Sequence, residues 1–312
     1  MSQSRKVHAC RIAWLMYCST WNNLSYFEME DKQKLTIPDL ANKKASGERL
    51  AMVAVGEAMS AAWAQRAGID IIGIGDSLGM TLHGHENTLA ITVDQMIDHA
   101  RAVRAGAPGL FSIISMPYGS YATPELAVQN AIRLMKEGGV DAVKLQGGRE
   151  MFDTIKAVAD AGVPVMSHVG LLPHRVHLAG GFKMQGRTCD EALRIVDNAK
   201  AIEEAGAIGL EIEAMPYEVG KAVDEAVRIF TFSIGAGAAG TCQLLNGYDL
   251  IGAFDTFKPK FAKRYANMSD VATRAFEAFA SEVRAGTFPD EDHSYKMNAA
   301  EAKKFIKALE EG

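Results

Sequence analysis

Residues 71–80 read Ile71-Ile72-Gly73-Ile74-Gly75-Asp76-Ser77-Leu78-Gly79-Met80, and they set a pattern that recurs along the chain. An apolar, β-branched run ends at a glycine and is followed by an acidic and a hydroxyl residue. This pattern is typical of a buried parallel strand that leads into a functional loop. Asp76 is therefore the first candidate active-site residue, although an isolated Gly-Asp-Ser can equally cap a helix or turn.

Seven further apolar stretches predict strands, namely Leu50–Val55, Leu110–Ser115, Ala142–Leu145, Val163–Ser167, Ala207–Glu213, Arg228–Ile234 and Gln243–Asn246. Stretches with helical spacing separate them, including Met59–Ala67, Val93–Arg104 and Pro124–Gly138. Strands that alternate with helices, with no linker rich in Pro, Gly or Ser, predict an α/β fold, a single parallel (β/α)8 TIM barrel. The alternative is an open, doubly wound sheet.

The predicted domain organisation is an N-terminal extension, residues 1–34, followed by one barrel domain with a C-terminal helix, residues 35–312. The extension has no acidic residue before Glu28. A cleaved transit peptide has that charge bias, but a mis-assigned start upstream of Met29 is the favoured interpretation.

The composition excludes several classes of function. The 312 residues carry a net charge of −5, with a pI near 5.9, so no basic field attracts nucleic acid or an anionic membrane. No apolar run approaches the roughly 18 residues of a membrane span. The four cysteines form no Cys-x-x-Cys pair, which indicates reduced thiols in a cytoplasmic enzyme; they are Cys10, Cys18, Cys189 and Cys242.

Polar residues with different chemistry follow the predicted strands. In a parallel barrel the carboxyl ends of the strands meet at one mouth, where the chemistry takes place. The mouth should therefore combine acids, a cation, an imidazole and hydroxyl groups from Asp76, Ser77, Ser115, Lys144, Gln146, His168 and Glu213.

Several longer motifs resemble ketopantoate hydroxymethyltransferases. They are Gly75–Met80, Gly84–Leu89, Arg101–Pro108, Val143–Gly148, His168–Leu171, Gly180–Arg187, Pro259–Phe261, Val283–Pro289 and Asp292–Ser294. The resemblance runs from about Thr36 to about Tyr295 and identifies a divergent member of that family.

The resemblance implies a TIM barrel of the phosphoenolpyruvate/pyruvate type that uses Mg2+ to hold a 2-oxo acid. The family transfers a hydroxymethyl group from 5,10-methylenetetrahydrofolate, as co-substrate, to 3-methyl-2-oxobutanoate, a step toward pantothenate. A divalent cation on the oxo and carboxylate oxygens stabilises the enolate that a base generates. The resemblance also implies a cytoplasmic homo-oligomer.

Residue by residue, the resemblance implies a role for each matching position. Glu213 would be the acid/base carboxylate, and Lys144 would bind the substrate as a fixed positive charge. Asp76 would be a metal ligand. Ser77, Ser115 and His168 would line the substrate site. For Lys144, the structural alternative is a surface lysine at a strand end.

Two departures remove carboxylates from the implied metal site. Ser115 stands where the family has a second metal-binding Asp, and Gln146 where it has a Glu. Mg2+ sites depend on carboxylates and water, so one carboxylate in place of three should bind the ion far more weakly. In the loop after the fifth strand, His174 and Arg175 replace an uncharged polar pair.

Two other metal arrangements stay open. Residues two apart on a strand share a face, so Glu211 should accompany Glu213 inside the barrel and pair with Lys144 or with a relocated cation. A register shift that places Glu211 in the mouth is equally open. Alternatively, His168, His174 and His177 could bind Zn2+, although their spacing matches no recognised motif.

The main functional hypothesis is a ketopantoate hydroxymethyltransferase-type enzyme that acts on a small 2-oxo acid, with an altered metal site. The first alternative is a carbon–carbon lyase or aldolase of the same superfamily that acts on another 2-oxo acid without folate. The second is a non-catalytic paralogue. Retention of Asp76, Lys144, His168 and Glu213 argues against complete loss of function.

Overall fold

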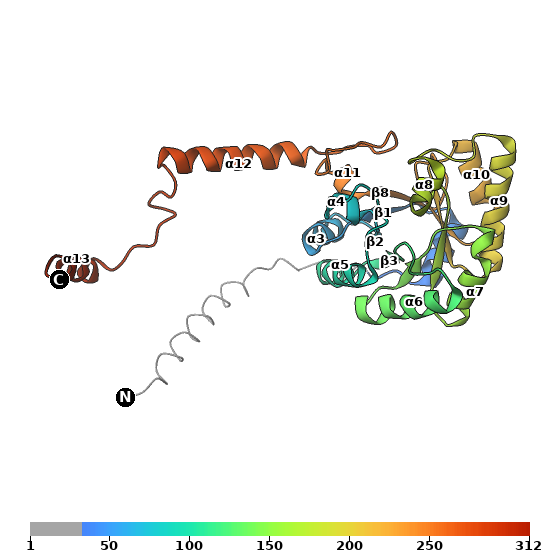
Figure 1. Cartoon of the computed structure of the whole chain (residues 1–312), viewed down its shortest axis with the longest axis horizontal. Helices are drawn as coiled ribbons and strands as arrows, with labels where there is room; N and C mark the ends of the chain where they lie inside the picture. The colour runs from blue at the N-terminus through green and yellow to red at the C-terminus, as the bar shows by residue number, and fades with distance from the viewer. Residues whose placement is uncertain (1–32) are drawn as a thin grey trace, which may run out of the picture. The chain divides into compact units, whose positions relative to one another are not determined.

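The computed structural model describes residues 33–312 (Figure 1). The predicted transit peptide or mis-assigned start, together with Cys10 and Cys18, falls outside the described residues. The chain divides into two compact units, the first ending at Leu244 and the second comprising Leu245–Gly312. The boundary expected between residues 34 and 35 stays a prediction.

Eight strands form a closed barrel in the order of the sequence, and every pair with an assigned register is parallel. Their bounds are β1 Leu50–Ala54, β2 Ile71–Ile74, β3 Phe111–Ser115, β4 Ala142–Lys144, β5 Val165–Gly170, β6 Gly209–Glu213, β7 Phe230–Ile234 and β8 Cys242–Asn246. The TIM-barrel prediction is confirmed.

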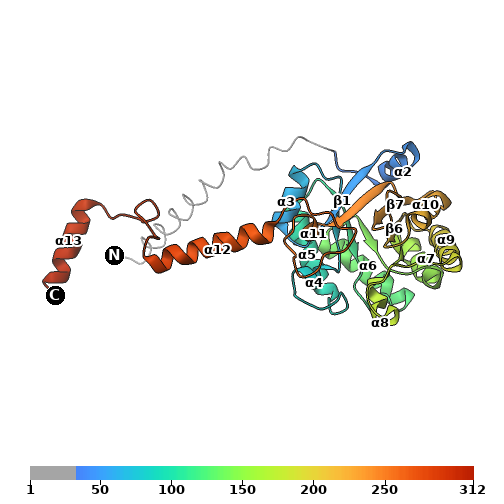
Figure 2. The ribbon, with the colours of Figure 1, turned by 90° about the horizontal axis from the view of Figure 1, so that it is seen from above.

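Helices surround the strands in the first unit, as Figure 2 shows for α3, α5, α6, α7, α9 and α10. The helices and 3-10 turns of this unit are α2 Ile37–Ser46, α3 Ala58–Arg66, α4 Leu78–Thr81, α5 Val93–Gly106, α6 Pro124–Gly138, η1 Arg149–Met151, α7 Phe152–Asp160, η2 Pro173–Arg175, α8 Val176–Ala179, α9 Cys189–Glu204 and α10 Tyr217–Ala226. The second unit contains α11 Gly247–Leu250, α12 Met268–Ala285 and α13 Ala299–Glu310. None of the described helices is long and apolar enough to cross a membrane.

Threonine caps fix where several helices begin. A capping threonine precedes each of α2, α5 and α9, namely Thr36, Thr92 and Thr188. Its side chain accepts a hydrogen bond from the backbone N–H three positions on, and the side chain at that position accepts one from the backbone N–H of the threonine. This reciprocal arrangement satisfies N–H groups that have no partner within the helix. Each helix start is therefore encoded locally.

The apolar core of the first unit includes residues from strands far apart in sequence. Met52, Ile71, Phe111, Phe230 and Phe232 are among its buried members. The rings of Phe230 and Phe232 stack, with centroids 5.9 Å apart. Apolar contacts therefore hold the strands together within the barrel, while the polar residues of interest lie toward the carboxyl ends of the strands.

Candidate active site

The strand ends bring the predicted polar residues to one end of the barrel. Ser115, Lys144 and Glu213 are the last residues of β3, β4 and β6, and Asp76 follows the end of β2 by two positions. His168 lies inside β5, because that strand continues to Gly170, beyond the predicted end at Ser167. Ser115, Asp76 and His168 are buried.

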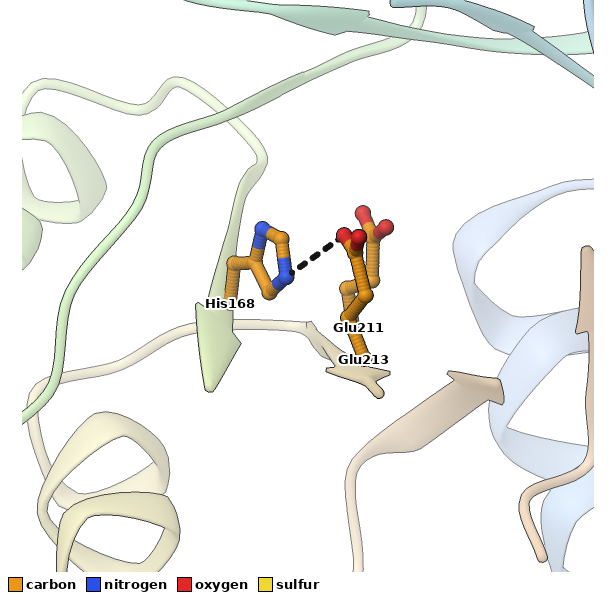
Figure 3. A group of neighbouring side chains, drawn as sticks. All are labelled: His168, Glu211 and Glu213. Atoms are coloured by element: carbon orange, nitrogen blue, oxygen red, sulfur yellow. Dashed lines mark ion pairs between the residues drawn. The ribbon is translucent and has the colours of Figure 1, made fainter. Parts of the chain in front are cut away.

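His168, Glu211 and Glu213 form a compact group on β5 and β6 (Figure 3). Nε2 of His168 lies 3.1 Å from Oε2 of Glu213, close enough for an ion pair when the ring is protonated. Nδ1 of this buried histidine has no hydrogen-bond partner among the described residues. A buried imidazole with one nitrogen free of contacts of this kind is available to a ligand.

The environment of Glu213 suits a base. Burial raises the pKa of Glu213 above its usual value of 4.5, although the His168 ring acts in the opposite direction. A carboxylate with a raised pKa is a stronger base than one in water, which favours proton abstraction near neutral pH.

Backbone geometry fixes Glu213 against β5. Gly170 pairs with Glu213 in the sheet and has a φ of +96°. A Cβ atom on Gly170 would lie 2.1 Å from the carbonyl oxygen of Glu213, so only glycine fits. Ala214, directly after Glu213, has a φ of 46°, a conformation that costs energy for a residue with a side chain.

Lys144 is not a surface lysine, since its side chain is 11% exposed and its ammonium group pairs with the carboxylate of Glu211. The sequence left open whether Glu211 pairs with Lys144, pairs with a cation or lies in the mouth of the barrel. In the structure it pairs with Lys144. Burial acts to lower the pKa of Lys144, but the carboxylates of Glu211, Asp76 and Glu213 together outweigh burial, and the pKa is raised. Lys144 therefore provides a fixed positive charge inside the barrel.

Asp76 is held by a residue from a different loop. Oδ2 of Asp76 lies 2.5 Å from Nε2 of His174, which belongs to η2 after β5. Burial acts to raise the pKa of Asp76, but the hydrogen bond with His174 and the nearby positive charges lower it below its usual value of 3.8. Asp76 is therefore an ionised, buried carboxylate with a hydrogen-bonded imidazole on one oxygen.

The other side of the His174 ring is also occupied. Nδ1 lies 2.5 Å from the hydroxyl of Tyr121, and both residues are buried. The backbone N–H of His174 donates to Oε1 of Gln146 at 3.0 Å, and the backbone N–H of Gln146 donates to the Tyr121 hydroxyl at 3.4 Å. Asp76, His174, Tyr121 and Gln146 form one buried network, which we call the Asp76 network.

The remaining predicted residues are placed as follows. Ser77 precedes α4 and is partly buried, and Ser115 pairs with Lys144 in the sheet. The three histidines considered for Zn2+ do not come together, because His174 contacts Asp76 and His177 is exposed. Glu57, which follows the first strand, caps α3 by accepting hydrogen bonds from the backbone N–H groups of Met59 and Ser60. The substrate roles of Ser77 and Ser115 stay predictions.

The donors near Asp76 do not fit a divalent magnesium site. Of the three positions at which the resemblance implies metal-binding carboxylates, Asp76 alone carries one, and His174 already contacts one of its oxygens. Ser115 and Gln146 contribute neutral groups, whereas Mg2+ is held in proteins by carboxylates and water. His168, Glu211 and Glu213 do offer ligand atoms within 4.8 Å of one another, which could hold a metal ion, but Lys144 already neutralises Glu211.

A pocket of about 630 Å3 adjoins His168. Its lining comes from β5, η1, α8 and α9 and includes both apolar and charged side chains. Arg149 pairs with Asp197 and Arg175 pairs with Glu150 along its wall. The volume falls in the range of ligand pockets, and His168 is the member of the buried group that lines it.

The sequence is similar to that of known enzymes over most of its length. Residues 34–291 match the family described as ketopantoate hydroxymethyltransferase. The 3-methyl-2-oxobutanoate hydroxymethyltransferase 1 of Methylibium petroleiphilum is 46% identical, over 90% of this chain and 95% of that protein. The 3-methyl-2-oxobutanoate hydroxymethyltransferase of Thermus thermophilus is 43% identical, over 83% of this chain and 99% of the relative.

Solved structures with a similar fold are more distant in sequence. Phosphonopyruvate hydrolase superposes with a TM-score of 0.56 at 13% identity, covering 87% of this chain and 96% of that chain. A 2,3-dimethylmalate lyase of the PEP mutase/isocitrate lyase superfamily superposes with a TM-score of 0.53 at 15% identity, covering 88% and 98%. At these identities the likeness shows the fold alone.

Proposed function

This chain belongs to the ketopantoate hydroxymethyltransferase family, and on that premise we propose that it transfers a hydroxymethyl group from 5,10-methylenetetrahydrofolate to 3-methyl-2-oxobutanoate. One observation of the structure carries the proposal. Glu213, with its raised pKa, shares the barrel interior with the Lys144 ammonium group and with the His168 ring, whose Nδ1 has no hydrogen-bond partner among the described residues. A base, a fixed cation and a hydrogen-bonding ring are what enolisation of a 2-oxo acid requires.

Each of these side chains has a defined task in the proposed reaction. Glu213 takes the proton from C3 of the 2-oxo acid, and the electron pair of that C–H bond moves to form the enolate. Lys144 stabilises the negative charge that develops on the substrate oxygens, because a buried ammonium group interacts strongly with an anion. His168 binds one of the same oxygens through Nδ1, the ring nitrogen that does not contact Glu213.

The enolate carbon then forms the new carbon–carbon bond with the one-carbon unit. In the overall reaction the methylene carbon loses its bonds to both folate nitrogens and gains its hydroxyl group from water. The nitrogens take up two protons, one equivalent to the proton lost from C3 and one from water. We propose that the pocket beside His168 admits the folate, since its volume suits a large ligand.

The family resemblance supports two further proposals, that the enzyme is cytoplasmic and that it forms a homo-oligomer. The subunit number is measurable by analytical ultracentrifugation of the purified chain. A single species at the mass of one chain would contradict the homo-oligomer.

The test of the proposed function is detection of the hydroxymethylated product by mass spectrometry. The reaction contains the purified chain, 3-methyl-2-oxobutanoate and 5,10-methylenetetrahydrofolate, in parallel with Glu213→Gln and Glu218→Gln. Glu218 is exposed on α10, so its variant controls for the loss of one carboxylate. We expect product with the unaltered chain and with Glu218→Gln, and product formation at least about 100-fold slower with Glu213→Gln.

A second candidate function is supported by the Asp76 network, which differs from the carboxylate site that the resemblance implies. It is a lyase or aldolase reaction on another 2-oxo acid without folate. Proton exchange with other 2-oxo acids, in the absence of product from 3-methyl-2-oxobutanoate, would favour this alternative.

A further inference from the structure

We infer that the His174 imidazole, fixed by Tyr121 and Gln146, takes the place of a divalent cation at Asp76, so that this chain binds and enolises its 2-oxo acid without a metal ion. The inference rests on the proposed function. His174, which lies beside Asp76 in the folded chain, is then a positioning residue for this buried carboxylate.

Asp76 and His174 are in direct contact inside the barrel. The two side chains are 7% and 5% exposed and lie 2.5 Å apart. A buried carboxylate is costly unless charges or hydrogen bonds compensate it. His174 supplies that compensation, which a cation would otherwise supply.

The imidazole of His174 is held firmly in its place beside Asp76. Both nitrogens are used, Nε2 by Asp76 and Nδ1 by Tyr121. The backbone N–H next to the ring is held by the Gln146 amide. A residue fixed through three separate contacts loses little further entropy when substrate binds, so the network is preorganised.

The groups around Asp76 are poor ligands for a divalent cation. A cation at Asp76 would replace the His174 contact, and the residues at the two other implied ligand positions, Ser115 and Gln146, offer neutral oxygens. The amide of Gln146 accepts the N–H of His174 without adding a negative charge. The positive charge of Lys144, which acts on Asp76, also opposes a second cation. These features favour the imidazole over the ion.

Other groups can meet the charge of the enolate. Lys144 carries three N–H donors and is paired with Glu211 alone among the ion pairs of the described residues. Nδ1 of His168 has no hydrogen-bond partner among the described residues, although the side chain is 1% exposed. The Lys144 ammonium group and the His168 imidazole can therefore bind the oxo and carboxylate oxygens of the substrate.

The experiment measures exchange of the C3 proton of 3-methyl-2-oxobutanoate in deuterated water by NMR, with no folate present. The unaltered chain is stripped with excess EDTA and assayed with and without added Mg2+. We expect the two exchange rates to agree within about twofold, because no step depends on the ion. Calorimetric titration with Mg2+ in the presence of the 2-oxo acid should show no saturable binding.

A triple variant provides the complementary result. Ser115→Asp, Gln146→Glu and His174→Ala together should create saturable Mg2+ binding in the same calorimetric titration, because three carboxylates then surround the position vacated by the ring. His174→Ala alone should slow exchange by about tenfold or more, since Asp76 loses its hydrogen-bond partner. His177→Ala removes an exposed imidazole from the same loop and should leave the rate unchanged.

Two outcomes would contradict the inference in distinguishable ways. Exchange that disappears in EDTA and returns with Mg2+, or saturable Mg2+ binding by the unaltered chain, overturns metal independence and leaves the proposed function intact. Absence of exchange both with and without Mg2+ shows that the chain does not enolise this substrate, which overturns the proposed function and the inference that rests on it.

Discussion

The ammonium group of Lys144 on β4 forms an ion pair with the carboxylate of Glu211 on β6, across the intervening strand β5. Neither charge is near bulk water, because the two side chains are 11% and 4% exposed. Removing one partner leaves the other charge buried without compensation, which is far more costly than removing both.

Lys144→Met is therefore expected to lower the free energy of unfolding by about 3 to 5 kcal/mol, and the double variant Lys144→Met with Glu211→Gln should recover most of that loss. Denaturant unfolding measures both values. Lys156→Met breaks an exposed pair with Asp160 and should change stability by less than about 1 kcal/mol. If the single and double variants lost equal free energy of unfolding, the loss would not come from leaving Glu211 buried without its partner.

Glu213→Gln should reduce C3 proton exchange by about 100-fold to 10,000-fold, because the amide cannot accept the proton. In the unaltered chain the rate should fall as the pH drops through the raised pKa of Glu213, so the acidic limb lies above pH 4.5. The measurement is a pH profile of exchange. If the exchange rate fell only at or below pH 4.5, the usual pKa of glutamate, burial would not raise the pKa of Glu213.

Gly170→Ala should destabilise the barrel by more than about 3 kcal/mol, because its Cβ would collide with the Glu213 carbonyl. Gly162→Ala is the matched control, since Gly162 also has a positive φ of 79° but no atom within 4 Å of the added carbon. That control should cost about 1 to 2 kcal/mol, from backbone strain alone. Similar losses for both variants would mean that the close approach at Gly170 contributes nothing.

Burial raises the pKa of Asp249, in the second unit, from 3.8 to about 6, although Arg264 acts in the opposite direction. A raised pKa means that the folded chain binds the proton more tightly than the unfolded chain does. The associated stability is present below pH 3.8 and is lost as the pH rises through about 6.

Carbon NMR should therefore show a carboxyl group that titrates near pH 6 and is absent from Asp249→Asn. Over the same range, the unaltered chain should lose stability relative to that variant as the pH rises. An Asp249 resonance that titrates near 3.8 would contradict this environment.

Much of the fold was predictable because its signals are local. Apolar runs identified all eight strands, and α6 runs from Pro124 to Gly138, as its sequence predicts. A threonine directly before Pro124 fixes the start, and Gly139 in a left-handed conformation fixes the end. The end of β5 was missed because its last residues include His168 and Gly170, which do not continue the apolar pattern.

The candidate site was only partly predictable. The positions of Lys144, His168 and Glu213 follow from the barrel, and the same-face spacing of Glu211 and Glu213 anticipated the pairing with Lys144. The Asp76 network could not be foreseen, since Asp76 and His174 lie 98 positions apart. Tyr121, which completes that network, carries no local sequence signal, because a tyrosine in a loop after a strand is an ordinary feature.

Closure of the barrel depends on residues at opposite ends of its sequence. The backbone N–H of Leu50 donates to the carbonyl of Thr241, and the Arg49 guanidinium donates to the carbonyls of Ala238 and Gly240. During synthesis the first strand must wait for almost the whole barrel to leave the ribosome, with its unpaired edge exposed. This seam is therefore where a nascent chain is most open to wrong pairing, and where a chaperone would protect it to greatest effect.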